Sequence, residues 1–140
     1  MSHALRRRLL AACLACAALA ARADEVVVIV HKDNPNPVSP DLVMRIYTGA
    51  IKGWPDGNPV MAFDQAEDAQ ARELFCSLVL RRSPANIKAI WSQNIFTGKG
   101  LPPKIAAPDA AMKRAVATNR NAIGYILSSQ LDDSVKAIGR

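Results

Sequence analysis

Residues that build metal sites and nucleophilic centres are scarce in this sequence. Its 140 residues include three cysteines and two histidines, and aromatic side chains make up 5% of the chain. Beyond residue 23, one cysteine (Cys76) and one histidine (His31) remain, in segments that predict different elements. A structural zinc ion needs about four such ligands, and an intramolecular disulfide needs a second cysteine. We therefore expect no metal site, no internal disulfide and no cofactor.

Catalytic signatures are also missing. The sequence contains no G-x-S-x-G, no phosphate-binding G-x-x-x-x-G-K-[ST] loop and no G-x-G-x-x-G. His31 has no nucleophile beside it in the sequence, and the acidic pairs Asp132–Asp133 and Glu67–Asp68 are typical of a solvated loop and a first helical turn. We therefore do not expect an enzyme.

The first 23 residues have the pattern of a targeting segment. Three arginines at 6–8 are followed by an unbroken run of twelve apolar residues, Leu9–Ala20, and by A-R-A at 21–23. Twelve residues are too few for a stable bilayer anchor. The order predicts a secretory signal peptide, residues 1–23, cleaved after Ala23, and hence a periplasmic or secreted protein with no membrane span after cleavage. A lipoprotein processed at Cys13 is the less favoured alternative.

Removing that segment lowers the charge of the chain. The whole sequence carries 18 basic and 12 acidic residues, whereas residues 24–140 carry 14 basic and the same 12 acidic residues, a net charge of +2. The longest basic runs there are the pairs Arg81–Arg82 and Lys113–Arg114. A nucleic-acid partner is therefore not expected. The remaining 117 residues suit one hydrophobic core, which predicts a single domain over 24–140.

Strand and helix patterns alternate along this domain. Ser39 and Ser83, each followed by proline, predict helix starts, and Gly49 and Gly98 predict the corresponding ends. Another helix is expected to begin at Pro108. Apolar runs predict strands at 25–31, 60–63, 102–107, 122–127 and 134–138. This alternation predicts an α/β fold with a mostly parallel sheet. We attribute the similar sequences IYTG and IFTG to shared helix capping and not to duplication.

The stretch FDQAEDAQARELF, residues 63–75, joins a predicted strand to a predicted helix. Such junctions can hold anions because the first N–H groups of a helix are unpaired. Here Asp64 and Glu67 fit a capping box, and Arg72 can pair with Asp68 four residues earlier. Three acids stabilise a helix start but repel an incoming dianion. The residues alone favour a self-capped structural helix.

Four stretches, taken in order, resemble the phosphate-type periplasmic substrate-binding proteins of ABC transporters. They are VVVIVHKDNP, SPDLVMRIYTGAIKGWPDGNPV, WSQNIFTGKGLPPK and NRNAIGYI. Proteins of that family close two α/β lobes over a ligand, and the resemblance covers only the crossover strand and the second lobe. It implies a single three-layer lobe of the periplasmic-binding-protein type.

The resemblance also places the family's anion cradle on residues 63–75. The family has an arginine there, followed shortly by G-S-G-T-R. Aligned on Arg72, the leading arginine falls at Gln65 and the G-S-G-T positions fall on 68–71. The resemblance thus implies a weak site for phosphate or another small oxyanion, with Gln65, Gln70 and Arg72 as ligand-binding candidates, in a domain linked to transport. The alternative is a non-transport module that binds an envelope protein or a second copy of itself.

The remaining aromatic and thiol side chains favour packing roles. Trp54, Trp91 and Tyr125 each lie in or beside an apolar pattern, and Cys76 follows Phe75 on an apolar helical stripe. We expect all four to be buried against the core and not to contact a ligand.

Overall fold

The computed structural model describes residues 25–138. The predicted signal peptide, residues 1–23, lies outside the described residues. The described helices are α2 (Pro40–Tyr47), α3 (Gln70–Leu74), α4 (Pro84–Phe96) and α5 (Asp109–Ala117), with a π-helical segment at Phe75–Leu80 and a 3₁₀ turn at Ser128–Gln130. The strands are β1 (Val26–Val30), β2 (Met61–Asp64), β3 (Lys104–Ile105), β4 (Ala122–Leu127) and β5 (Lys136–Ala137).

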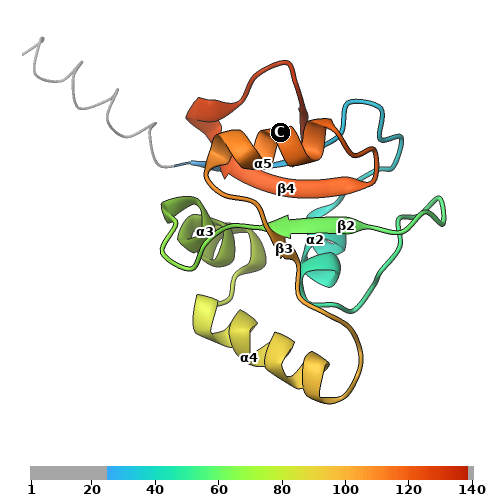
Figure 1. Ribbon diagram of the computed structural model, residues 1–140, viewed down its shortest axis with the longest axis vertical. Coiled ribbons are helices and arrows are strands. Elements are labelled where there is room, and N and C mark those ends of the chain that lie inside the picture. The colour runs from blue at the N-terminus through green and yellow to red at the C-terminus, as the bar shows by residue number, and fades with distance from the viewer. Residues whose placement is uncertain (1–24, 139–140) are drawn as a thin grey trace, which may run out of the picture.

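These five strands form a mixed sheet in the order β3-β2-β4-β1-β5 (Figure 1). β2 runs parallel to both β3 and β4, whereas β1 is antiparallel to β4 and to β5. Four of the five described strands therefore point the same way and only β1 is reversed, which confirms the mostly parallel prediction. The reversal of β1 does not follow from its sequence, because an apolar run reads the same in either direction.

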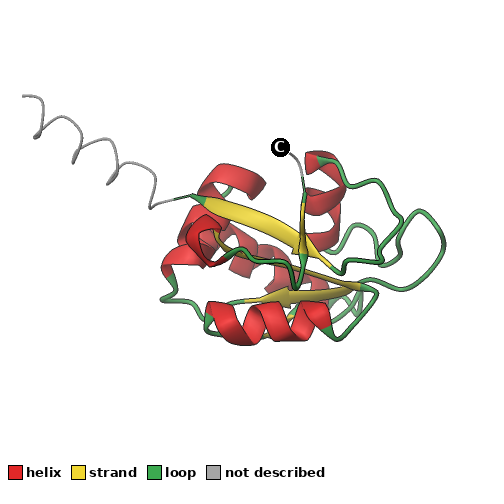
Figure 2. Ribbon diagram, turned by 90° about the horizontal axis from the view of Figure 1, so that it is seen from above, coloured by secondary structure: helices red, strands yellow, loops and turns green. Residues whose placement is uncertain are grey.

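Helices cover both faces of the sheet and make three layers (Figure 2). One core cluster joins Val28 and Val30 of β1 to residues of α2, α3, the π-helical segment and α4. The other joins Ile29 of the same strand to Met112 and Val116 of α5. β1 is thus covered on both sides, as its unbroken apolar run predicts. Both clusters are built from residues between Val26 and Ile138.

Serine caps begin the two helices where they were predicted. The Ser39 side chain accepts a hydrogen bond from the Leu42 N–H at 3.1 Å, and the Ser83 side chain accepts one from the Asn86 N–H at 3.1 Å. Proline follows each cap in the first turn, where its missing N–H costs nothing.

The two helices also end in the same way. Gly49 and Gly98 follow the C-caps with φ angles of 77° and 71°, in the left-handed region that favours glycine. One residue later, the Ala50 N–H reaches the Arg45 carbonyl at 2.9 Å and the Lys99 N–H reaches the Asn94 carbonyl at 2.8 Å. Both ends are therefore Schellman motifs, which agrees with the shared capping to which we attribute the IYTG and IFTG similarity.

Aromatic side chains occupy the centre of the larger core cluster. The rings of Phe75 and Tyr125 stack with their centroids 3.9 Å apart, and Tyr47 packs edge-on against Phe75 at 4.8 Å. Cys76 is buried beside them as a thiol. Trp54 is buried in the core as predicted, whereas Trp91 is only partly buried against it, and both indoles donate to backbone carbonyls at 2.9 Å. Within residues 25–138, no helix has the length and apolar character needed to cross a membrane.

Candidate functional site

A groove lies where the three parallel strands end. β3, β2 and β4 have their carboxyl ends at the same edge of the sheet, and the loops that leave them line a cavity of about 630 Å³. Its lining comes from residues 65–71 except Glu67, from 107–110, and from Leu127 and Gln130. We call it the strand-end groove. Since α3 packs on one face of the sheet and α5 on the other, the groove lies where ligands bind in open α/β sheets.

The helix beside this groove starts later than the sequence predicts. β2 extends to Asp64, which pairs with Ile105 of β3, and α3 begins only at Gln70 after an Ala69 cap without a side-chain bond. The expected capping box of Asp64 and Glu67 is therefore wrong. Sheet pairing holds Asp64 in the strand, and Glu67 instead forms an exposed ion pair with Lys88 at 3.3 Å.

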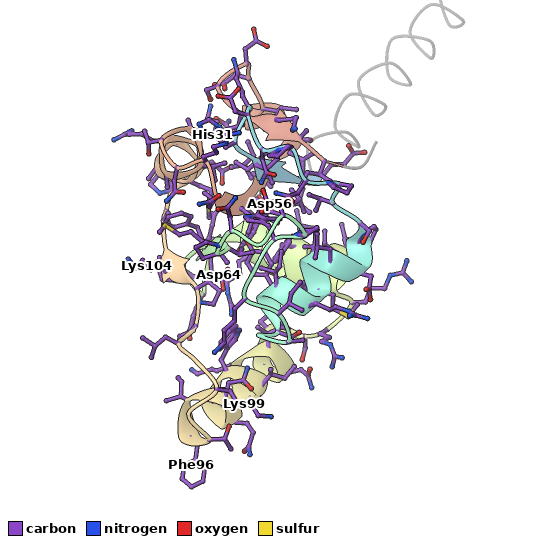
Figure 3. The ribbon with its side chains drawn as sticks, turned by 90° about the vertical axis from the view of Figure 1, so that its right-hand side faces the viewer. His31, Asp56, Asp64, Phe96, Lys99 and Lys104 are labelled. Carbon is purple, nitrogen blue, oxygen red and sulfur yellow. The ribbon has the colours of Figure 1, made fainter. Side chains whose placement is uncertain are left out.

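Asp64, labelled in Figure 3, is the centre of a partly buried polar network. Its carboxylate lies 3.5 Å from the Arg72 guanidinium Nε, with both side chains largely shielded from solvent. It also accepts a hydrogen bond from the Tyr125 hydroxyl and one from the Gln65 N–H at 2.8 Å. The predicted pair of Arg72 with Asp68 is therefore wrong, because Arg72 turns inward to the strand carboxylate.

Two tyrosine hydroxyls are fixed around this carboxylate. Burial raises the pKa of Tyr47 well above its ordinary value, and the negative charge of Asp64 raises it further. Burial and Asp64 raise the pKa of Tyr125 in the same way. Both phenols therefore stay protonated and donate hydrogen bonds, Tyr47 to the Phe63 carbonyl at 2.7 Å and Tyr125 to Asp64.

The Gln65 side chain joins residues of β4 and α5 beneath the groove by hydrogen bonds. Its amide donates to Asp109 Oδ1 at 2.7 Å and to the Tyr125 carbonyl at 3.0 Å. The other Asp109 oxygen accepts from the Leu127 N–H at 3.1 Å. The carboxylate at the start of α5 thereby ties the ends of β2 and β4 together. The groove floor is preorganised by these bonds, and part of its donor capacity is already satisfied by an internal carboxylate.

The charge of the strand-end groove is negative at its surface. Its lining includes the acids Asp68 and Asp109 and the amides Gln65, Gln70 and Gln130, but no lysine or arginine. Arg72 lies behind the lining with 8% of its surface exposed, and Asp64 holds it there. A dianion entering this groove would meet amide side chains together with two carboxylates.

The three predicted ligand-binding residues therefore have different positions. Gln65 and Gln70 line the groove, Gln65 being buried and Gln70 exposed, while Arg72 lies beneath it. Whether any of them contacts a ligand stays a prediction. Sequence reasoning missed Asp109 and Gln130. Asp109 carried a usable signal, because it opens a helix directly after a predicted strand and so had to fall at the same sheet edge.

The histidine and the possible metal ligands of residues 25–138 lie away from the groove or apart from one another. His31 Nδ1 accepts a hydrogen bond from the Asp33 N–H at 3.0 Å, at the sheet edge opposite the groove. No group of three or more histidine, cysteine or carboxylate side chains gathers in this part of the chain as a metal site would require.

Comparison with solved structures identifies similar folds. The chain resembles a putative phosphate ABC transporter substrate-binding protein from Clostridium perfringens, solved with bound phosphate, with a TM-score of 0.67 and 27% identity. It also resembles an ABC-type phosphate transport receptor from Vibrio cholerae, at a TM-score of 0.62 and 22% identity, and PstS from Borrelia burgdorferi, at 0.63 and 9%. No model of a protein family and no curated protein sequence matches the chain.

The similarity covers most of this chain but only part of each neighbour. It includes 82%, 82% and 83% of this chain and 44%, 45% and 47% of the three neighbours, respectively. The chain thus spans less than half the length of the solved structures it matches. The resemblance stated from the sequence and the α/β fold of the periplasmic-binding-protein type are both confirmed.

Proposed function

We propose that this chain, which has the fold of part of a phosphate ABC transporter substrate-binding protein, is an exported solute-binding domain that takes phosphate or a similar small oxyanion weakly in the strand-end groove. The observation that carries the proposal is the position of the groove. It lies at the carboxyl ends of three parallel strands, between the starts of α3 and α5, in a fold shared with a phosphate-bound neighbour. The alternative of a protein-interaction module gains no support from the comparisons.

The three candidate residues take different roles in this proposal. Gln70, exposed at the start of α3, contacts the bound oxyanion through its amide. Gln65 positions Asp109 and the end of β4 from beneath. Arg72 is buried and does not contact the ligand. Its ion pair with Asp64 holds α3 against the end of β2. Gln70 is therefore the candidate whose loss should affect oxyanion binding most directly.

Weak binding follows from the acids in the lining. Asp68 and Asp109 repel a fully ionised guest, while the groove offers no cation in return. A protonated oxyanion is less affected, because its O–H can donate to the Asp109 carboxylate, which only accepts hydrogen bonds. We therefore expect phosphate, which carries such a proton near neutral pH, to bind better than sulfate, which does not. An affinity in the millimolar range corresponds to about −4 kcal/mol.

Calorimetric titration with phosphate and with sulfate tests the proposal. Asp68→Asn removes one exposed repelling charge and should tighten phosphate binding by about fivefold, as expected for about 1 kcal/mol at a solvated surface. Gln70→Ala should weaken it. Asp33→Asn is the matched control, because this exposed acid lies in the loop after β1, at the opposite sheet edge. Absence of saturable binding, or an equal response of Asp68→Asn and Asp33→Asn, would refute the site.

Export is a separate part of the proposal and has its own test. The N-terminal pattern of arginines, apolar run and small residues supports it. Expression of the full chain in a Gram-negative host, followed by mass spectrometry of the periplasmic fraction, should give a protein that begins at Asp24. A protein that stays in the cytoplasm with its N-terminal segment uncleaved would contradict export. That result would not bear on oxyanion binding in the groove. We also propose that the domain binds its solute and does not catalyse a reaction.

A further inference from the structure

The end of α4 exposes large apolar side chains to an unusual degree. Phe96 is 88% exposed and Leu101, just beyond the helix, is 82% exposed, the two highest values among the large apolar residues of the described chain. Ile95 is 50% exposed. We call Ile95, Phe96 and Leu101 the apolar tip. Single exposed apolar residues are normal, but three within seven positions at one end of a molecule indicate a contact surface.

The fold does not require this exposure. Tyr47 occupies the same position of a Schellman motif at the end of α2 as Phe96 does at the end of α4. Tyr47 is 2% exposed and packs against Phe75, whereas Phe96 points away from the protein. An aromatic residue at this capping position can therefore be buried. Capping explains why the helix stops there, but it leaves the exposure of Phe96 unexplained.

The chain segment that contains the apolar tip carries charge of one sign. From Leu74 to Pro108 the chain contains no aspartate or glutamate, but it contains five lysines and arginines. Lys88 pairs with Glu67. Lys52, Lys99 and Lys104 form no ion pair within residues 25–138. Lys52 lies next to Gly100, since a Cβ added to Gly100 would be 3.3 Å from the Lys52 ammonium nitrogen.

The shape and charge of the apolar tip favour a membrane over a protein as its partner. Figure 3 places Phe96 at the far end of the molecule, beyond Lys99, with Lys104 further along on its strand. A projecting tip needs a partner that can deform around it or that has a matching hollow. Lysine is depleted at protein–protein interfaces, whereas lysines beside exposed phenylalanine and leucine are typical of surfaces that bind anionic membranes.

We infer that the apolar tip and Lys52, Lys99 and Lys104 form a docking surface for an anionic phospholipid bilayer. Phe96 and Leu101 enter the boundary between headgroups and acyl chains, and the lysine ammonium groups bind lipid phosphates. This surface uses none of the residues that line the strand-end groove. It does not depend on the proposed oxyanion binding, and either proposal can fail without the other.

Vesicle co-sedimentation tests the inference on the chain that starts at Asp24, which contains both core clusters and lacks the apolar run of residues 9–20. Vesicles of phosphatidylcholine and phosphatidylglycerol in equal parts should bind the protein, less so as salt rises, and phosphatidylcholine alone should not. Phe96→Ala should weaken binding by about tenfold, given the value of burying one such side chain. Lys99→Gln should weaken it by about fivefold and flatten the salt dependence.

Leu78→Ala is the matched control. Leu78 is 59% exposed on the π-helical segment, outside the apolar tip, so its loss should leave vesicle binding unchanged. Phe96→Trp supplies a second readout, since tryptophan emission should shift to the blue on insertion by more than in the parent protein. Failure of the parent protein to bind phosphatidylglycerol vesicles would overturn the inference. Equal effects of Phe96→Ala and Leu78→Ala on vesicle binding would also overturn it. So would binding of an acidic protein to this surface without binding of vesicles.

Discussion

Arg72 gives the sharpest test of how the strand-end groove is supported. Replacing Arg72 with methionine keeps much of the volume but leaves the Asp64 carboxylate without its cation, at a site where the two side chains are 10% and 16% exposed. Breaking a buried pair from one side costs about 3–5 kcal/mol. Asp64 keeps two donors, the Tyr125 hydroxyl and the Gln65 N–H. We therefore expect a loss below that range, of about 2–3 kcal/mol.

Urea unfolding followed by circular dichroism measures this loss. The control is Arg45→Met, because Arg45 and Asp41 form an ion pair of 2.9 Å whose side chains are 59% and 71% exposed. An exposed pair of this kind contributes about 0–0.5 kcal/mol. A double-mutant cycle with Asp64→Asn then isolates the pair, with an expected coupling of about 1–2 kcal/mol. Additive effects, or equal losses for Arg72→Met and Arg45→Met, would refute a supporting role for the buried pair.

Two further predictions concern titratable groups of the core. Tyr47 and Tyr125 have folded pKa values above their ordinary value of 10.0, so the unfolded state loses protons first as pH rises. The free energy of unfolding should be fully maintained below pH 10 and fall above it, by about 1.4 kcal/mol per pH unit for each tyrosine. Tyr125→Phe should roughly halve the slope, and an unchanged slope would contradict this reasoning. Burial also raises the pKa of the Cys76 thiol, so a thiol reagent should label Cys76 only after unfolding; rapid labelling of the folded protein would contradict its burial.

Local patterns predicted the elements of the fold well because their causes are local. The caps at Ser39 and Ser83 and the glycines that end both helices depend on neighbours within about four residues. The strand at 122–127 agrees with the observed bounds of β4. The direction of β1 and the strand order depend on contacts between distant residues, which no local pattern contains.

The stretch 63–75 shows where sequence reasoning failed. Asp64 looked like a helix cap, since Glu67 follows three residues later. Its position is decided instead by pairing with Ile105 of β3 and by Arg72 and Tyr125, residues up to 61 positions away. Tertiary contacts thus override a capping signal that is worth only about 1 kcal/mol.

The same contacts separate the predicted site residues by depth. Their spacing in the chain could not show that Arg72 faces inward while Gln70 faces the strand-end groove. The role of Gln65 depends on Asp109, which is 44 residues away in the sequence. The stretch therefore contains both the floor and the wall of the groove, and only part of it is available to a ligand.

Mapping of backbone amide shifts during a phosphate titration tests the central claim most directly. We predict saturable shifts at millimolar phosphate for the backbone amides that line the strand-end groove, at residues 65, 66, 68–71, 107, 109 and 110, with smaller shifts for sulfate. Residues 95–101, around the apolar tip, should not respond. Shifts confined to surface lysines, or the absence of any saturable response in the groove, would contradict the account.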